Sequence, residues 1–151
     1  MKYLSQSPKE TGGLAELLAE EILATKPAKK TLAVALVGEL GSGKTTFIKA
    51  LLRALGVKGR VVSPTFIFSR QFKSKRGHYK NFFHFDVYRL TSGTPKEAKN
   101  IGLNEALKSA ENLVLVEWAD KVKNALPKGT IWIEFKHGTK PNERHLTFNR
   151  R

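Results

Sequence analysis

The chain has 151 residues, and we expect residues 1–151 to form a single domain with a substantial core. It has no cysteine, which excludes disulfides and cysteine-ligated zinc and favours a cytoplasmic protein. No apolar run approaches the ~18 residues of a membrane span, and the amino terminus lacks the apolar centre of a secretory signal, so we expect no membrane association. The 27 Lys and Arg against 13 Asp and Glu give a net charge of +14, which favours polyanionic partners or simply a soluble basic surface.

The first elements of the chain have strong patterns. Apolar residues at helical spacing predict a helix over Thr11 to Thr25, with Thr11 as a possible N-cap. The continuous apolar run Thr31 to Val37 predicts a strand buried on both faces, as in a parallel sheet. A glycine-rich loop at 38–43 leads into a second predicted helix, Lys44 to Leu55.

The middle of the chain has a different pattern of apolar and polar residues. Phe66 to Phe72 and Asn81 to Tyr88 predict an antiparallel hairpin around a basic turn. Pro95 to Ala110 predicts one or two short helices. Leu113 to Val116 predicts another buried strand, which ends at Glu117.

The chain closes with a short helical stretch and a second hairpin. The helical stretch is predicted to end at Leu126, just before Pro127. Ile131 to Phe135 and His145 to Phe148 predict the hairpin strands.

The loop Gly38 to Thr45 (GELGSGKT) fits the phosphate-loop pattern G-x-x-x-x-G-K-[ST] at every fixed position. Glycines let backbone amides approach phosphates closely, and the following helix presents its positive end. Lys44 can place a charge on the β- and γ-phosphates, and the Thr45 hydroxyl can ligate Mg²⁺. The motif therefore predicts binding of ATP with Mg²⁺; GTP is disfavoured because no Asn-Lys-x-Asp element is present.

The phosphate loop and the order of elements together predict the fold class. We expect an α/β, P-loop NTPase-like three-layer sandwich. Its mixed sheet should have parallel strands at the nucleotide site and added antiparallel hairpins.

Two acids are candidates for the chemistry. Glu117 ends a buried strand, so it should reach the sheet edge where the phosphate loop lies and contact magnesium or water; an ion pair with a Lys is the alternative. Asp86 lies in an aromatic strand beside His84, and a surface ion pair with Arg89 explains it equally well. His84 alone is typical of an ordinary strand histidine.

Other positions are less specific. Thr65, in the segment Ser63-Pro64-Thr65, could sense a γ-phosphate as switch residues do, although the segment is also typical of a plain turn. Trp118 is more typical of core packing than of a stacking platform. The exposed charges Arg70, Lys73, Lys75, Arg76 and Lys80 make the first hairpin basic; contact with tRNA or an acidic partner and a merely solvated hairpin are equally open.

Four segments taken together resemble the TsaE family, the small ATPases of bacterial tRNA threonylcarbamoyladenosine biosynthesis. In chain order they are GELGSGKTTF, SPTF, HFDVYRL and VEW. The segment IGLNEAL, Thr11 with its helix, and Arg144 are similar to family features too, so the resemblance covers nearly the whole chain. Two departures are the absence of a proline and an acid after Glu117-Trp118 and the unusually basic composition.

The resemblance implies roles for these residues. Thr45 and Glu117 would hold Mg²⁺, and the catalytic candidates are Asp86, Glu117 and Thr65. The cofactor-binding residues expected from the loop and the resemblance are Thr11, Glu39, Leu40, Gly41, Ser42, Gly43, Lys44, Thr45, Thr46, Trp118 and Arg144. The protein partners would be subunits of a threonylcarbamoyl-transferase complex, which modifies adenosine next to the anticodon of ANN-reading tRNAs and which the ATPase would bind and reset.

Two other functions use the same features. A small-molecule P-loop kinase would need an acceptor pocket and a lid with catalytic arginines, for which the chain has little room. A basic RNA-binding module with a vestigial nucleotide site would not need Lys44, Thr45, Asp86 and Glu117.

Overall fold

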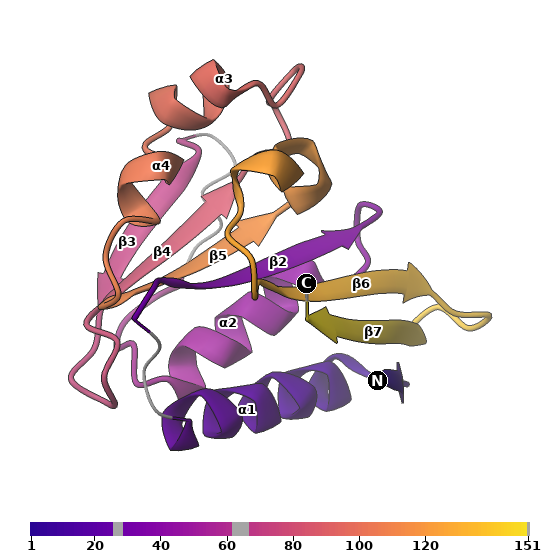
Figure 1. Cartoon of the computed structure of the whole chain (residues 1–151). Helices are drawn as coiled ribbons and strands as arrows, with labels where there is room; N and C mark the ends of the chain where they lie inside the picture. Colours follow the sequence, from indigo (N-terminus) through magenta and orange to yellow (C-terminus); the bar gives the residue numbers. More distant parts are fainter. Residues whose placement is uncertain (26–28, 62–66, 151) are drawn as a thin grey trace.

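The computed structural model describes residues 1–25, 29–61 and 67–150. Within them the chain forms a seven-stranded sheet in the order β1-β7-β6-β2-β5-β4-β3 (Figure 1). The strand bounds are β1 Lys2–Ser5, β2 Leu32–Gly38, β3 Ser69–Lys73, β4 Asn81–Asp86, β5 Asn112–Glu117, β6 Ile131–His137 and β7 Arg144–Arg150.

The sheet is mixed, as predicted. Strand β2 lies at its centre and pairs in parallel with both β5 and β6, and β5 pairs in parallel with β4. The two hairpins, β3–β4 and β6–β7, are antiparallel, and β1 pairs antiparallel with β7. The parallel strands thus occupy the middle of the sheet and the antiparallel pairs its margins.

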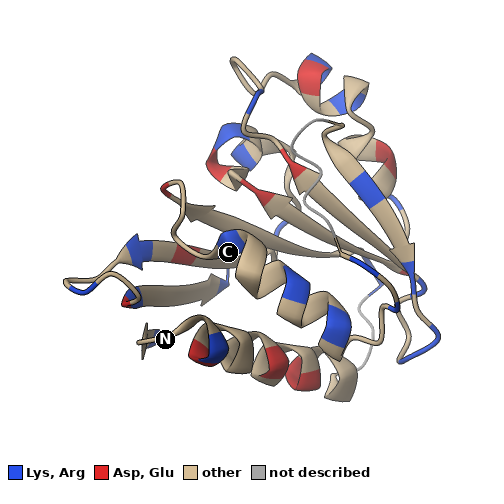
Figure 2. Cartoon of the chain, turned by 180° about the vertical axis from the view of Figure 1, so that it is seen from behind, with Lys and Arg blue, Asp and Glu red and all other residues tan. Residues whose placement is uncertain are grey.

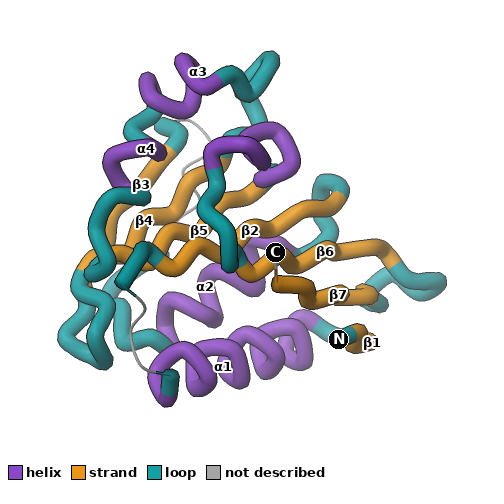
Figure 3. The backbone as a smooth tube through the Cα atoms, in the orientation of Figure 1, coloured by secondary structure: helices purple, strands orange, loops and turns teal. Residues whose placement is uncertain are grey.

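Helices cover both faces of the sheet and complete the three layers (Figures 1 and 3). One face carries the two long helices, and the other carries short helices together with the 3₁₀ segment η1. Their bounds are α1 Pro8–Ala24, α2 Lys44–Ala54, α3 Pro95–Asn100, α4 Leu103–Ala106 and η1 Ala119–Ala125. No helix in the described residues is long and apolar enough to span a membrane.

Successive side chains of β5 point to opposite faces of the sheet and therefore belong to two separate core clusters. Leu113 and Leu115 pack in the cluster under α1 and α2, whereas Val114 and Val116 belong to the cluster under α3, α4 and η1. The strand is buried along its whole length, which explains its unbroken apolar sequence. Helix α2 buries Phe47, Ile48, Leu51 and Leu52, and its C-cap residue Leu55 is buried too.

The prediction that Thr11 caps the first helix is wrong. Helix α1 begins at Pro8, and its N-cap is Ser7, whose hydroxyl accepts a hydrogen bond from the Glu10 amide at 3.2 Å. Thr11 is buried in the first turn, and its hydroxyl lies 2.8 Å from Ser5 Oγ. The apolar periodicity begins only at Leu14, so the sequence pattern missed the polar first turn.

The first predicted hairpin strand begins later than its sequence indicated, and one strand was not predicted at all. Strand β3 starts at Ser69, directly after Phe68, which has the left-handed φ of 59° that ends extended pairing. Strand β1 is four residues long and mostly exposed, so it has no buried alternation that a sequence pattern could reveal.

Candidate nucleotide site

Three parallel strands end at the same edge of the sheet. Strand β2 ends at Gly38, where the phosphate loop begins, while β4 and β5 end at Asp86 and Glu117. Asp86 and Glu117 lie opposite one another in the register of the β4–β5 pair. The topology thus brings both predicted acids to the edge that carries the loop, as expected for a parallel sheet.

The loop itself depends on glycine. A Cβ at Gly38 would lie 2.4 Å from the Phe135 carbonyl oxygen, so any side chain there would collide with backbone. Gly43, with φ 102°, is the N-cap of α2 and provides no side-chain cap for the first N–H groups of the helix. Uncapped N–H groups at a helix N-terminus are suited to an anion, since the helix dipole adds a positive potential there.

Lys44 is buried at the start of α2, with 4 % of its surface exposed. Its ammonium donates to the carbonyl oxygens of Gly38 and Glu39, at 2.8 Å each, and lies 4.1 Å from the centroid of the Trp118 ring. Burial lowers the pKa of Lys44 below its ordinary value, while the carboxylates of Glu117, Asp86 and Asp120 oppose that shift. An anion bound in the loop would therefore stabilise the charged form of the buried Lys44 side chain.

Glu117 connects the loop to the sheet interior. The Thr45 hydroxyl donates to Glu117 Oε2 at 2.9 Å, although the two residues are 72 positions apart in the sequence. On the other side, His84 Nε2 lies 2.8 Å from Glu117 Oε1. His84 is fully buried and Glu117 is 2 % exposed, so these contacts are shielded from water. Of the predicted alternatives for Glu117, these contacts favour a role at the site over an ion pair with a Lys.

His84 is the site residue that the sequence analysis missed. His84 Nε2–H donates to the Glu117 carboxylate, which only accepts, and Nδ1 is buried without a hydrogen-bond partner among the described residues. A signal was present in the sequence. His84 is a polar residue in an otherwise aromatic strand, two positions before Asp86 and therefore on the same strand face.

Asp86 and the aromatic residues close the site. Asp86 is 5 % exposed and accepts a hydrogen bond from the Tyr88 amide at 3.0 Å. Trp118 has a left-handed φ of 60°, which turns the chain from β5 into η1. Its ring lies 4.9 Å from that of Tyr88 as well as beside the Lys44 ammonium. Trp118 thus contacts the site, rather than only packing in the core.

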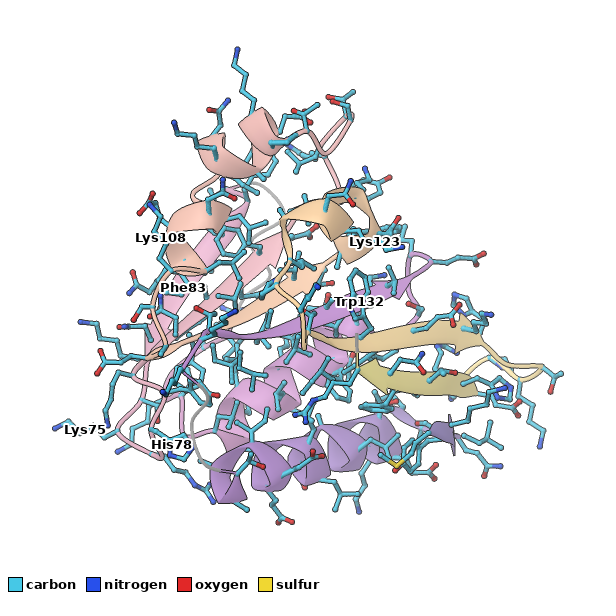
Figure 4. All side chains as sticks on the ribbon, viewed as in Figure 1. Lys75, His78, Phe83, Lys108, Lys123 and Trp132 are labelled. Carbon is cyan, nitrogen blue, oxygen red and sulfur yellow. The ribbon has the colours of Figure 1, made fainter. Side chains whose placement is uncertain are left out.

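These groups line a cavity of about 310 Å³. Its lining residues are Leu40, Gly41, Ser42, Gly43, Lys44, Thr45, Thr46, Asp86, Tyr88, Glu117 and Trp118. A larger hollow of about 790 Å³ is also lined by Trp118, together with Lys123 of η1 and Trp132 of β6, which Figure 4 labels. We assign the candidate site to the smaller cavity, because the loop and both acids line it.

The remaining predicted residues surround the loop. Arg144, at the start of β7, donates to the Gly41 carbonyl oxygen at 3.1 Å. A Cβ built on Gly43 would lie 3.9 Å from Thr11 Cγ2, so Thr11 is next to the loop. Glu39 lines the larger hollow with Trp118. Thr65 lies outside the described residues, so its switch role stays a prediction.

The residues present fit a magnesium ion with a bound phosphate chain. Thr45 and Glu117 offer oxygen atoms, the ligand type that Mg²⁺ prefers, and their side chains already meet at 2.9 Å. No cluster of three or more His, Cys, Asp or Glu in the described residues has the arrangement of a metal site. Mg²⁺ bound with a nucleotide commonly takes one or two protein ligands and completes its shell with phosphate oxygens and water.

The fold and the loop define a P-loop NTPase-like α/β protein, in which a central parallel sheet presents a glycine-rich loop and a strand-end acid at one edge. The match to the family model for threonylcarbamoyl adenosine biosynthesis protein TsaE covers residues 5–146. The chain belongs to the TsaE family.

Individual relatives agree with this assignment. The chain is 32% identical over 148 residues to the tRNA threonylcarbamoyladenosine biosynthesis protein TsaE of Bacillus subtilis, covering 98% of this chain and 84% of that relative. It is 38% identical over 104 residues to the protein of the same name from Rickettsia bellii, covering 68% and 67%. Among solved structures, that of Bacillus subtilis YdiB matches with a TM-score of 0.69 and 29% identity over 99% of this chain and 84% of that one. Family membership confirms the resemblance and connects the chain with tRNA threonylcarbamoyladenosine biosynthesis.

Proposed function

We propose that this protein binds ATP with Mg²⁺ at the 38–45 loop and hydrolyses it slowly, as an accessory ATPase of tRNA modification. The observation that carries the proposal is the hydrogen bond between Thr45 and Glu117 beside the buried Lys44. Within the family's pathway the protein would bind a threonylcarbamoyl-transferase complex and reset it between cycles. That complex acts on adenosine next to the anticodon of ANN-reading tRNAs.

Each residue has a role that follows from its place. Loop amides and Lys44 would bind the phosphates, and bound Mg²⁺ would supply positive charge against the phosphate oxygens. Thr45 and Glu117 would hold the metal, and His84 would keep the Glu117 carboxylate oriented. Asp86, opposite Glu117 in the register, is suited to orienting the attacking water. Trp118 would shield the site from bulk water.

The composition of the cavity supports slow turnover by the isolated protein. Among the described residues that line it, Lys44 is the only Lys or Arg. Phosphoryl transfer develops negative charge on the leaving-group oxygen and requires stabilisation of the charged phosphoryl oxygens, and many P-loop enzymes receive an additional cation from a partner. Partner subunits would therefore accelerate hydrolysis by adding charge or by ordering the site.

The lining of the cavities favours this function over the kinase alternative. A kinase acceptor would have to occupy the larger hollow of about 790 Å³, and no Arg among the described residues lines either cavity. A vestigial site is disfavoured too, since the Lys44 ammonium is held by the Gly38 carbonyl oxygen and the Thr45 hydroxyl donates to the Glu117 carboxylate.

ATP hydrolysis by the pure chain, with and without the transferase partners of its host, tests the proposal. Lys44→Ala removes the ammonium, and Lys49→Ala on the same helix controls for the loss of a Lys. We expect slow turnover alone, stimulation by the partners, and loss of both only in Lys44→Ala. ATP binding without any response to the partners would overturn the accessory role, and fast turnover by the chain alone would contradict partner dependence.

A further inference from the structure

Residues 40–85 contain ten Lys and Arg and no Asp or Glu. One of the ten, Lys44, belongs to the candidate nucleotide site. The others lie on α2, on the segment that follows it, and on the β3–β4 hairpin. Figure 2 shows Lys and Arg along α2 and at the turn joining β3 to β4, with the acidic residues of α1 running alongside. This stretch therefore holds ten of the 27 Lys and Arg and none of the 13 Asp and Glu, so net positive charge is concentrated in it.

Hydrogen bonds fasten the hairpin turn to the end of α2. Arg76 donates to the Ala54 carbonyl oxygen at 2.7 Å, and Ser74 donates to that of Leu55 at 2.9 Å. A Cβ at Gly56 would lie 2.7 Å from Ser74 Oγ, so glycine permits this close approach. Two segments separated in sequence thus form one continuous basic surface, which consists of the exposed side chains of Arg53, Lys58, Lys73, Lys75, Arg76 and Lys80.

The basic surface is not neutralised by salt bridges within the described residues. None of the six side chains has a salt bridge to a carboxylate among the described residues; the ion pairs in that part of the chain involve other residues. Lys75 extends away from the body of the molecule at the turn (Figure 4). Unpaired cations that share one surface attract a polyanion and release its counterions on binding.

The composition of the surface favours a nucleic acid over an acidic protein. Of the large hydrophobic side chains that are exposed in the described residues, only Leu40 and Ile67 fall within 40–85, and Leu40 belongs to the phosphate loop. Protein interfaces have an apolar core, whereas nucleic-acid interfaces are more polar and strongly positive. We propose that the basic surface binds structured RNA through its phosphate backbone.

The fold keeps this surface apart from the nucleotide site. Helix α2 begins at Lys44 in the loop and ends at Ala54 beside the hairpin turn, and its 11 residues span about 16 Å. The Debye length at physiological ionic strength is about 8 Å, so the charges of bound ATP are screened from the turn. RNA and ATP should therefore bind at the same time. The inference depends on charge and geometry and does not require that the proposed ATPase function be correct.

A binding titration of an unmodified, ANN-reading tRNA transcript against the full chain tests the inference. The variant Lys73→Glu/Lys75→Glu/Lys80→Glu reverses the charge of three side chains at the hairpin turn. It leaves Arg76 unchanged, because Arg76 donates a hydrogen bond to the Ala54 carbonyl oxygen of α2. The matched control Lys9→Glu/Lys96→Glu/Lys128→Glu makes the same change in net charge at exposed residues elsewhere. Equal thermal unfolding midpoints would show that both variants fold.

We expect the turn variant to bind tRNA at least ~tenfold more weakly, and the slope of log affinity against log salt to fall by about 2–3. The control should retain most of the affinity, and saturating ATP should not displace the RNA. Equal losses in both variants, or equally effective competition by polyglutamate, would reduce the effect to non-specific charge and overturn the proposal. RNA binding that survives in Lys44→Ala, with ATP hydrolysis abolished, separates this inference from the proposed function.

Discussion

His84 Nε2 lies 2.8 Å from Glu117 Oε1, and both side chains are almost completely buried. His84 does not itself line the cavity, so its contact with the candidate site runs through Glu117. Since Glu117 also accepts from Thr45, the imidazole fixes one carboxylate oxygen and leaves the other directed to the loop. His84 is thus a positioning residue for the site.

Replacement of His84 should weaken the fold through Glu117. His84→Leu leaves the buried carboxylate with one donor fewer, and we expect the free energy of unfolding to fall by about 1–3 kcal/mol. His84→Gln supplies an amide donor and should recover part of that loss. Urea unfolding at pH 7 measures both. A Leu variant as stable as the parent protein would show that the contact contributes nothing.

Replacement of Thr45 should separate metal binding from phosphate binding. Thr45→Val keeps the shape of the side chain but removes the hydroxyl that meets Glu117. We expect ATP binding in EDTA to be nearly unchanged, while the gain in affinity on adding Mg²⁺ falls at least ~tenfold. Calorimetric titrations with and without Mg²⁺ measure this difference. Thr25→Val, at an exposed threonine outside the cavity, is the control, and an equal effect there would refute the assignment.

Replacement of two loop glycines should separate the energetic cost of a steric clash from the cost of a left-handed backbone conformation. Gly38→Ala would place a Cβ 2.4 Å from the Phe135 carbonyl oxygen, whereas Gly41→Ala, at φ 70°, meets no atom within 4 Å. We expect Gly41→Ala to cost roughly 1–2 kcal/mol for its left-handed backbone. Gly38→Ala should cost about 1–3 kcal/mol more because the sheet must shift. Urea unfolding measures both, and equal losses would contradict the geometry.

The contribution of the α3 cap to stability should be lost between pH 4.5 and about 2. The Thr94 amide and the Ser92 hydroxyl donate to the Glu97 carboxylate and lower its pKa to about 2. A carboxylate whose pKa is lowered in the folded state stabilises the fold at pH values above its ordinary pKa of 4.5. This contribution is lost as the pH falls through the folded-state pKa of about 2. The stability difference between the parent protein and Glu97→Gln should therefore shrink from pH 4.5 downward. An NMR titration of the Glu97 carboxyl carbon with a midpoint above 4 would refute the prediction.

The sequence by itself determined the parts whose patterns are local. The unbroken apolar runs identified β2 and β5 because a strand buried on both faces needs apolar side chains at every position. The loop motif identified Gly38 and Lys44 because phosphate binding constrains the residue type at each fixed position. The acid at the end of β5 followed from the same logic, since parallel strands end at one edge.

Only the tertiary structure decided what depends on contacts between distant segments. It brought His84 to Glu117, set Asp86 opposite Glu117 across two strands, and gave Trp118 the left-handed turn that places its ring over Lys44. It also joined the hairpin turn to the end of α2, which turned a basic composition into a basic surface. Register, side-chain direction and loop closure create these contacts, and none of the three has a period or a motif in the sequence.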